Sequence, residues 1–165
     1  MTHVVRRART PDVQSIKKLV DGYAGHDILL AKDLVTLYED IQEFRVAELD
    51  GKLVGCGALH VLWEDIAEIR TVAVHPQARG LGIGATIVRA LLDAARELGL
   101  KRVFVLTFET AFFGRHGFVE TSGTPVPPGV YEQMRRSYDE GVAEFLDLPY
   151  VKPNTLGNTR MLLVL

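Results

Sequence analysis

Apolar residues recur at helical spacing in three parts of the chain. Positions 13, 16, 19 and 20 form one apolar stripe, and we expect Thr10 to cap this helix with Pro11 at its first position. A second stripe runs from Leu34 to Ile41 and predicts a helix that ends near Glu43. Positions 83, 87, 91, 95 and 98 keep to one face of a third helix, which Gly99 stops at its C-terminus.

Other segments have the composition and alternation of β-strands. They are the runs 4–7, 44–49, 52–63, 67–74 and 102–106. Asp50-Gly51 separates two of these runs and is typical of a tight type I′ hairpin turn. The continuous apolar run 102–106 follows a helix, so it predicts a parallel strand that is covered on both faces and reached by a right-handed crossover.

The last third of the chain gives a weaker pattern. We expect a short helix at 110–116, a strand at 118–120, a loop at 121–129, one helix at 130–145 that Gly141 interrupts, and a final strand at 158–165. Together, the elements predict one α+β domain that spans residues 1–165. Its sheet is expected to be mixed but mostly antiparallel, to contain about six to seven strands, and to be flanked by helices.

The segment between the strand at 67–74 and the helix that starts at Ile83 has glycine at every second position, in the order R-G-L-G-I-G from Arg79 to Gly84. Such glycines let the backbone approach a ligand closely, while the helix start presents unpaired N–H groups and a positive dipole end, an arrangement that binds phosphate. A tight turn that needs positive φ is the alternative. A P-loop is excluded because Gly84 is followed by Ala85 and Thr86. Residues 80–85 also match the relaxed dinucleotide fingerprint G-x-G-x-x-A. The first glycine of that fingerprint lies in the turn directly after the strand, whereas residues 75–79 separate the strand from Gly80 here.

Composition removes several classes of function. The chain has 165 residues, a formal net charge of −2 and a pI near 6.2, so it lacks the basic excess that binding to nucleic acid requires. It has no signal-peptide core and no run of about 18 apolar residues, from which we expect a cytoplasmic protein that does not enter a membrane. Cys56 is the only cysteine and is expected to be a buried strand thiol, and the five histidines are too scattered for a metal site.

The glycine segment resembles the R/Q-x-x-G-x-G/A signature of the GNAT acetyltransferase superfamily, with Arg79, Gly82 and Gly84 in the defining places. Strand, helix, strand and a later F-F-G-R-H-G-F follow in family order, so the resemblance covers nearly the whole chain. It implies a GNAT fold, acetyl-CoA as cosubstrate and, at the level of the superfamily, a homodimer. The loop would hold the pyrophosphate, and the backbone of the preceding strand would bind the pantetheine arm and the thioester oxygen. The implied cofactor-binding residues are Thr71, Val72, Val74, Arg79, Gly80, Leu81, Gly82, Ile83, Gly84 and Phe113.

The segments LLAKDLVTLYEDIQEF, DIAEIRTVAVHP, LKRVFVLT and FFGRHGF together resemble the acetyltransferase domain of N-acetylglutamate synthases. That resemblance implies transfer of acetyl from acetyl-CoA to the α-amine of glutamate, the first step of arginine biosynthesis. It also implies that Glu68 is the general base, and strand alternation would place Glu68 on the same face as Val72 and Val74. The superfamily's usual acid, a tyrosine, is replaced by Phe113. Thr107 matches a hydroxyl residue to which the role of the acid is assigned in the synthases. Thr107 itself could position a water or donate a hydrogen bond to the departing thiolate.

The acceptor's carboxylates need cations. The resemblance points to Lys32 and Thr159 as substrate-binding residues, and Arg70 and Arg7 are further cationic candidates. Gly157 stands where the synthases have a substrate-binding arginine, and loss of a bidentate carboxylate partner makes glutamine a rival to glutamate. Other acceptors stay open, among them a polyamine, an aminoglycoside or a protein N-terminus, because acidic residues gather at 139–147. A hypothesis of another class is a non-catalytic acyl-CoA sensor, which the phenylalanine in place of tyrosine suggests.

Overall fold

A seven-stranded mixed sheet organises the chain in the computed structural model, which describes residues 2–24, 33–148 and 158–165. Its strand order is β1-β2-β3-β4-β5-β7-β6, and only β4 and β5 pair in parallel among these strands. The strands are β1 (His3–Arg7), β2 (Phe44–Leu49), β3 (Lys52–Trp63), β4 (Ile66–Val74), β5 (Arg102–Thr107), β6 (Val119–Glu120) and β7 (Thr159–Val164). The α+β fold with a mostly antiparallel sheet is therefore confirmed.

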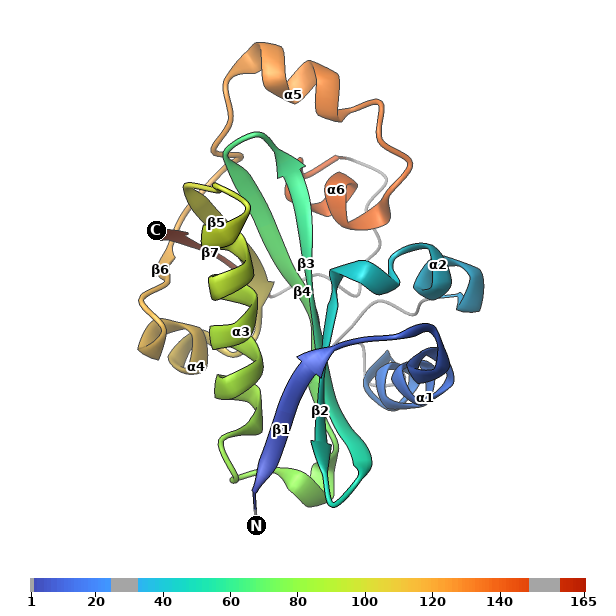
Figure 1. The fold of residues 1–165 in the computed structure, drawn as a ribbon. Coiled ribbons are helices and arrows are strands. Elements are labelled where there is room, and N and C mark those ends of the chain that lie inside the picture. Colours follow the sequence, from blue (N-terminus) through green and yellow to red (C-terminus); the bar gives the residue numbers. More distant parts are fainter. Residues whose placement is uncertain (1, 25–32, 149–157) are drawn as a thin grey trace.

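Helices cover both faces of this sheet (Figure 1). They are α1 (Val13–Ala24), α2 (Leu34–Glu39), α3 (Ile83–Glu97), α4 (Thr110–Arg115), α5 (Pro128–Met134) and α6 (Glu140–Phe145), and short 3-10 turns occupy Thr10–Asp12, Ile41–Glu43 and Pro76–Ala78. The long helix α3 packs on one face and forms the largest apolar cluster there. On the opposite face, α1 and α2 cover β2 and β3, while α5 and α6 cover the ends of β3, β4 and β5. The molecule thus has two separate compartments on that second face.

Two glycines let α3 lie directly against β3. A Cβ built on Gly57 would come 2.8 Å from Cγ2 of Ile87 and 3.1 Å from Cδ1 of Leu91, and both of these side chains are fully buried. A Cβ on Gly55 would lie 2.9 Å from Cδ1 of Ile87. The small residues in β3 therefore set how closely α3 approaches the sheet, and with it the position of the N-terminus of α3.

We expect Gly57→Ala to destabilise the protein, because the added methyl group overlaps buried side chains that have no room to move. Overpacking of this kind costs about 1–3 kcal/mol of the free energy of unfolding, which urea denaturation would measure. The matched control is Gly22→Ala in α1, where a Cβ meets nothing within 4 Å and alanine should raise helix stability by about 0.5–1 kcal/mol. Equal effects of the two substitutions would contradict this account of the packing.

β4 contains a bulge that reverses the direction of its side chains. Cys56 of β3 faces Ala73, but Ala58 faces Arg70, so two residues of β4 oppose the single residue Gly57. Thr71 lies in this bulge with φ of 59°, which a β-branched residue rarely adopts. Before the bulge, Ala67 and Ile69 belong to the apolar cluster under α3; after it, Val72 and Val74 pack there instead.

The expectation that Glu68 shares a face with Val72 and Val74 is therefore wrong. Glu68 lies on the opposite face, with Ile66 and Arg70, where α6 covers the sheet. The prediction assumed unbroken alternation along β4, and the extra residue in the bulge breaks that alternation.

Three element boundaries also differ from the sequence prediction. The first helix is not capped by Thr10; a 3-10 turn precedes it, and the carboxylate of Asp12 accepts the N–H of Arg9 at 2.7 Å. The second helix ends at Glu39 and is followed by a separate 3-10 turn, whose buried Ile41 mimicked a continued helical stripe.

Instead of one helix over 130–145, the chain forms α5 and α6, with a break that places Asp139 as the N-cap of α6. Oδ1 of Asp139 accepts the N–H of Val142 at 2.9 Å. Asp-x-x at a helix start is a recognisable capping signal, but the apolar spacing across the break concealed it.

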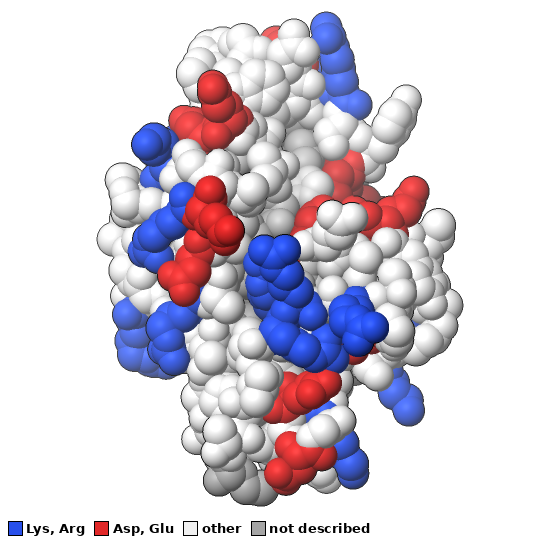
Figure 2. Space-filling model, in the orientation of Figure 1, with Lys and Arg blue, Asp and Glu red and all other residues white. Residues whose placement is uncertain are grey.

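Acidic and basic side chains alternate on the face shown in Figure 2, with a group of basic side chains near its centre, over β1 and β2. Arg7 of β1 and Arg45 of β2 face each other in register in these two strands. Burial, followed by the charge of Arg7, lowers the pKa of Arg45. Arg7, a further candidate for binding the acceptor, is not among the residues that line the cavity described below.

No described helix is long and apolar enough to cross a membrane.

Candidate active site

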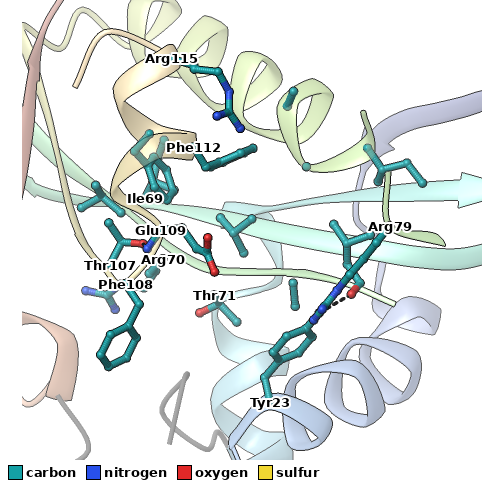
Figure 3. A pocket seen from close by; sticks show the side chains of 18 of the residues that line it. Tyr23, Ile69, Arg70, Thr71, Arg79, Thr107, Phe108, Glu109, Phe112 and Arg115 are labelled. Atoms are coloured by element: carbon teal, nitrogen blue, oxygen red, sulfur yellow. Dashed lines mark hydrogen bonds between the residues drawn. The ribbon is translucent and has the colours of Figure 1, made fainter. Parts of the chain in front are cut away.

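A cavity of about 680 Å³ opens where β4 and β5 separate (Figure 3). The two strands pair only as far as Glu68 and Phe104, and the residues that follow, 69–74 and 105–109, line its walls. The start of α3 and the helix α4 complete the lining. The lining includes most of the predicted site residues, namely Arg70, Thr71, Val72, Val74, Arg79, Gly80, Gly82, Ile83, Gly84, Thr107 and Phe113.

Three of the predicted site residues that the structure describes do not line the cavity. The side chain of Leu81 is 42% exposed, while Glu68 and Thr159 lie beside the cavity in β4 and β7. Lys32 lies outside the described residues, as does Gly157. Most residues of the predicted phosphate loop therefore lie together at the cavity, whereas the predicted acceptor residues are only partly described.

The glycine loop ends at the N-terminus of α3. Gly80 and Gly82 have φ of 81° and 76°, and Gly82 is the N-cap of this 15-residue helix. Gly82, Ile83, Gly84 and Ala85 all line the cavity, so the first turn of α3 lies at its wall. The free N–H groups of a helix's first turn and its positive dipole end together stabilise an anion there. This end of the cavity is suited to a diphosphate.

Tyr23 of α1 holds Arg79 at the mouth of the cavity, a contact that the sequence pattern did not reveal. The hydroxyl of Tyr23 donates to the carbonyl of Val74 and accepts from Nη2 of Arg79 at 2.7 Å. The guanidinium of Arg79 lies 5.6 Å from the centre of the Tyr23 ring, within range of a cation–π contact. Figure 3 shows this pair beside the cavity, with Phe112 and Arg115 of α4 at the opposite side. The cavity therefore has arginines at two places suited to phosphate groups.

The bulge of β4 lies in the cavity wall and leaves part of its backbone unpaired with β3. The carbonyl of Thr71 accepts a hydrogen bond from the thiol of Cys56 at 3.4 Å. Cys56 is fully buried, and burial raises the pKa of its thiol to about 12. The prediction of a buried strand thiol is confirmed, and its burial disfavours the thiolate form that a nucleophile needs.

Thr107 and Thr159 face each other in register at the ends of β5 and β7. Thr107 is buried, and its Oγ1 accepts the N–H of Glu109 at 2.8 Å. The hydroxyl proton of Thr107 is not used in that bond, so it can be donated toward the cavity. Phe113, in contrast, packs edge-on against Phe112 and Phe118 and contributes only an apolar surface.

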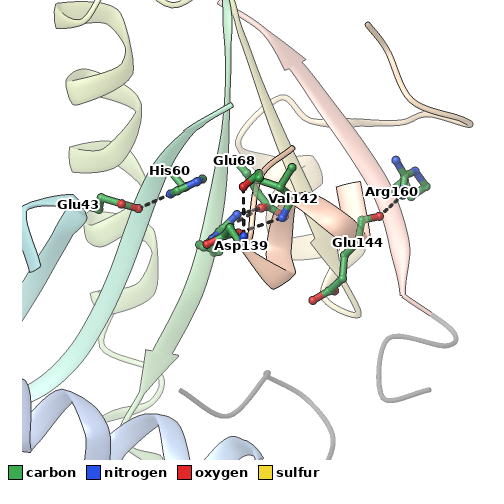
Figure 4. A network of polar contacts seen from close by, with 9 residues as sticks. Glu43, His60, Glu68, Asp139, Val142, Glu144 and Arg160 are labelled. Atoms are coloured by element: carbon green, nitrogen blue, oxygen red, sulfur yellow. Dashed lines mark hydrogen bonds and ion pairs between the residues drawn. The ribbon is translucent and has the colours of Figure 1, made fainter. Parts of the chain in front are cut away.

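Glu68 belongs to a buried network of charges on the face covered by α6 (Figure 4). Nε and Nη2 of Arg70 donate to Oε1 of Glu68 at 3.1 and 2.7 Å. Nη1 of Arg70 donates to both carboxylate oxygens of Asp139, at 2.8 and 2.9 Å. Arg70, predicted as a substrate-binding residue, is thus already bonded to two carboxylates of its own chain.

Burial and nearby charges together shift the pKa values of Glu68 and Asp139 in opposite directions. Burial raises the pKa of Glu68, and the charge and hydrogen bonds of Arg70 offset only part of that rise. At Asp139, burial also acts to raise the pKa, but the charges of Arg70 and His60 outweigh it and the pKa is lowered. His60, whose Nδ1 lies 2.8 Å from Oε1 of Glu43, extends the network to the turn before β2. Glu68 is therefore suited to accept a proton, while Asp139 stays ionised.

Two further residues near this network have structural roles. The guanidinium of Arg160 donates to the backbone carbonyls of Gly123, Glu144 and Phe145 and lies 4.9 Å from the ring of Phe104. Gly141, which interrupts the predicted helix, has no room for a Cβ because the guanidinium of Arg70 lies 2.4 Å from that position. Within residues 2–24, 33–148 and 158–165, no group of three His, Cys, Asp or Glu side chains is placed to hold a metal ion.

Comparison with known proteins agrees with this geometry. The family model described as acetyltransferase (GNAT) family matches residues 14–118. An amino-acid acetyltransferase of Mycobacterium tuberculosis is 70% identical over 165 residues, which covers 98% of this chain and 94% of that protein. A crystal structure from the same organism, in complex with CoA and NLQ, superposes with a TM-score of 0.95 at 70% identity and covers 98% of this chain and 99% of that one.

A longer protein shares the same fold in one of its parts. The N-acetylglutamate synthase of Neisseria gonorrhoeae, solved with coenzyme A and N-acetyl-glutamate, superposes with a TM-score of 0.79 at 28% identity. This match covers 100% of the present chain but 35% of the synthase. The glycine loop, the bulged strand and the diverging pair β4 and β5 are thus parts of an acetyltransferase, and the chain belongs to the acetyltransferase (GNAT) family.

Proposed function

We propose that this protein transfers the acetyl group of acetyl-CoA to the α-amine of glutamate or glutamine by direct attack in a ternary complex. The observation that carries the proposal is the cavity, in which the first turn of α3 and the bulge of β4 line adjoining walls. The names of the M. tuberculosis and N. gonorrhoeae relatives support an amino acid as the acceptor. We further propose that the reaction is the first step of arginine biosynthesis and takes place in the cytoplasm.

The donor half of the site binds acetyl-CoA through its diphosphate and its thioester. The diphosphate lies on the N–H groups at the start of α3, with Arg79 beside it. The pantetheine arm runs along the backbone of β4 between Val72 and Val74, which brings the thioester to the bulge at Thr71. A backbone N–H of the bulge then stabilises the oxyanion of the tetrahedral intermediate.

The acceptor half supplies a base and a hydrogen-bond donor. Glu68 takes the proton of the α-ammonium group through a water molecule. It is near enough to do so because it is hydrogen-bonded to Arg70, which lines the cavity. The freed amine attacks the thioester carbon, its nitrogen releases a second proton to water, and the C–S bond of the intermediate breaks. Thr107 donates a hydrogen bond to the departing thiolate, which then takes its proton from solvent. The chain thus performs the acid step without the tyrosine that Phe113 replaces.

The experiment that tests this function is thiol release from acetyl-CoA by the purified protein, with glutamate, glutamine, other amino acids and a polyamine as separate acceptors. We expect turnover with glutamate or glutamine and none with the polyamine. Turnover with the polyamine alone would assign a cationic acceptor, and the acidic residues near α6 would then be its binding surface. Tight CoA binding with no acceptor used would instead support a non-catalytic acyl-CoA sensor.

A further inference from the structure

We propose that Asp139 determines which acceptor side chain this enzyme accepts, because it occupies the guanidinium of Arg70 that an acidic side chain would need. The inference rests on the proposed function. It concerns the choice between a carboxylate and an amide at the end of the acceptor side chain, that is, between glutamate and glutamine.

Arg70 is the cation best placed to bind an acceptor carboxylate, since it lines the cavity and bonds directly to the proposed base Glu68. An arginine offers five N–H donors in a fixed planar fork. Nε and Nη2 of Arg70 reach Glu68, and Nη1 reaches both oxygens of Asp139. The side chain is 10% exposed, so water competes little for these bonds.

Asp139 is held in this position from its own side as well. It caps α6 through the N–H of Val142, and the backbone at Gly141 lies so close to the guanidinium that no Cβ fits between them. The carboxylate that faces Arg70 is therefore a built part of the fold. It stands where a substrate carboxylate would stand in an enzyme that uses this arginine for binding.

The charges around Arg70 make a second acid unfavourable. Glu68, Asp139 and the Glu43 beside His60 are acids of the same network. Arg160, a half-buried arginine of this region, donates its hydrogen bonds to three backbone carbonyls. A glutamate side chain that approaches Arg70 meets like charge at short range, whereas the neutral amide of glutamine does not.

The test compares kcat/KM for glutamine with kcat/KM for glutamate in the full-length wild type and in Asp139→Asn. Asparagine is an N-cap residue as good as aspartate, so α6 keeps its start while the charge on Arg70 is released. We expect the glutamine-to-glutamate ratio to fall by about tenfold or more, because the variant loses a like charge and frees a donor for the substrate carboxylate. Both acceptors are measured in one preparation, so any fraction of inactive protein cancels from the ratio.

Glu140→Gln is the matched control, since it removes the same charge from the adjacent, exposed position of α6. Its ratio should stay within about twofold of the wild type, as screening by solvent predicts. If Asp139→Asn yields no folded protein, Asp139→Ser, another good N-cap, takes its place.

An unchanged ratio in the Asp139 variant overturns the inference and leaves the proposed function intact, and an equal fall in both variants overturns it as well. A wild type that acetylates neither amino acid overturns the proposed function and, with it, this inference.

Discussion

Glu68→Gln is expected to lower kcat/KM by about 10²- to 10⁴-fold while the dissociation constant of CoA stays near that of the wild type. The substituted amide cannot accept the proton of the α-ammonium group, but its oxygen can still accept the hydrogen bonds of Arg70, so the network keeps its shape. Steady-state thiol release and calorimetric titration with CoA would measure the two quantities.

The pH dependence of kcat/KM shows whether Glu68 acts as a base or has only a structural role. In the wild type, kcat/KM should rise with pH through the pKa of Glu68, which burial places above its ordinary value, because the base acts only when deprotonated. Glu68→Gln should lose this limb. A variant that keeps both the limb and at least a tenth of the activity would remove Glu68 from the mechanism.

The parts of the fold that rest on local chemistry were predictable from the sequence. Asp50 and Gly51 form the expected turn, with φ of 52° and 76°, because an Asp-Gly pair tolerates that conformation better than almost any other. The glycines before α3 likewise predicted a tight loop, because glycine adopts the positive φ that Gly80 and Gly82 have, 81° and 76°, without strain.

The parts that rest on distant contacts were not predictable. Thr71 carries no signal of the bulge, because its left-handed conformation is imposed by the surrounding sheet and not by its own preference. Asp139 lies 69 positions from Arg70 in the sequence, and Tyr23 lies 56 positions from Arg79. No periodicity or motif connects residues so far apart. The resemblance pointed to Glu68, but only the structure shows which face it occupies and which arginine holds it.

Gly82→Val is expected to weaken the binding of acetyl-CoA by about a hundredfold, or about 2.7 kcal/mol. Valine is strained at φ of 76°, so the loop turns away from that conformation and the N–H groups of the first turn of α3 no longer point together at the diphosphate. Titration with CoA and a thermal melt would measure affinity and stability side by side.

Gly99→Val is the matched control for this loop. Gly99 follows the other end of α3, has φ of 85° and, like Gly82, has no neighbour within 4 Å of a built Cβ. Both variants should lower the melting temperature by similar amounts, because they strain the backbone alike. If Gly99→Val weakened CoA binding as much as Gly82→Val, the effect would come from general destabilisation of α3 and the phosphate-loop assignment would fail.

The bulge at Thr71 also bears on how such an enzyme can change. On β4, Glu68 and Arg70 point to the α6 compartment, whereas Ala67 and Ile69 before the bulge and Val72 and Val74 after it point to α3. Under the proposed function, one face of β4 therefore serves the acceptor through Glu68 and Arg70, and the other face serves the donor through Val72 and Val74. A substitution on the α6 face of β4 can therefore change the surroundings of Glu68 while the side chains that face α3 stay in place. Loss of one residue at the bulge would restore unbroken alternation and turn the side chains on one side of the bulge to the other face of the sheet.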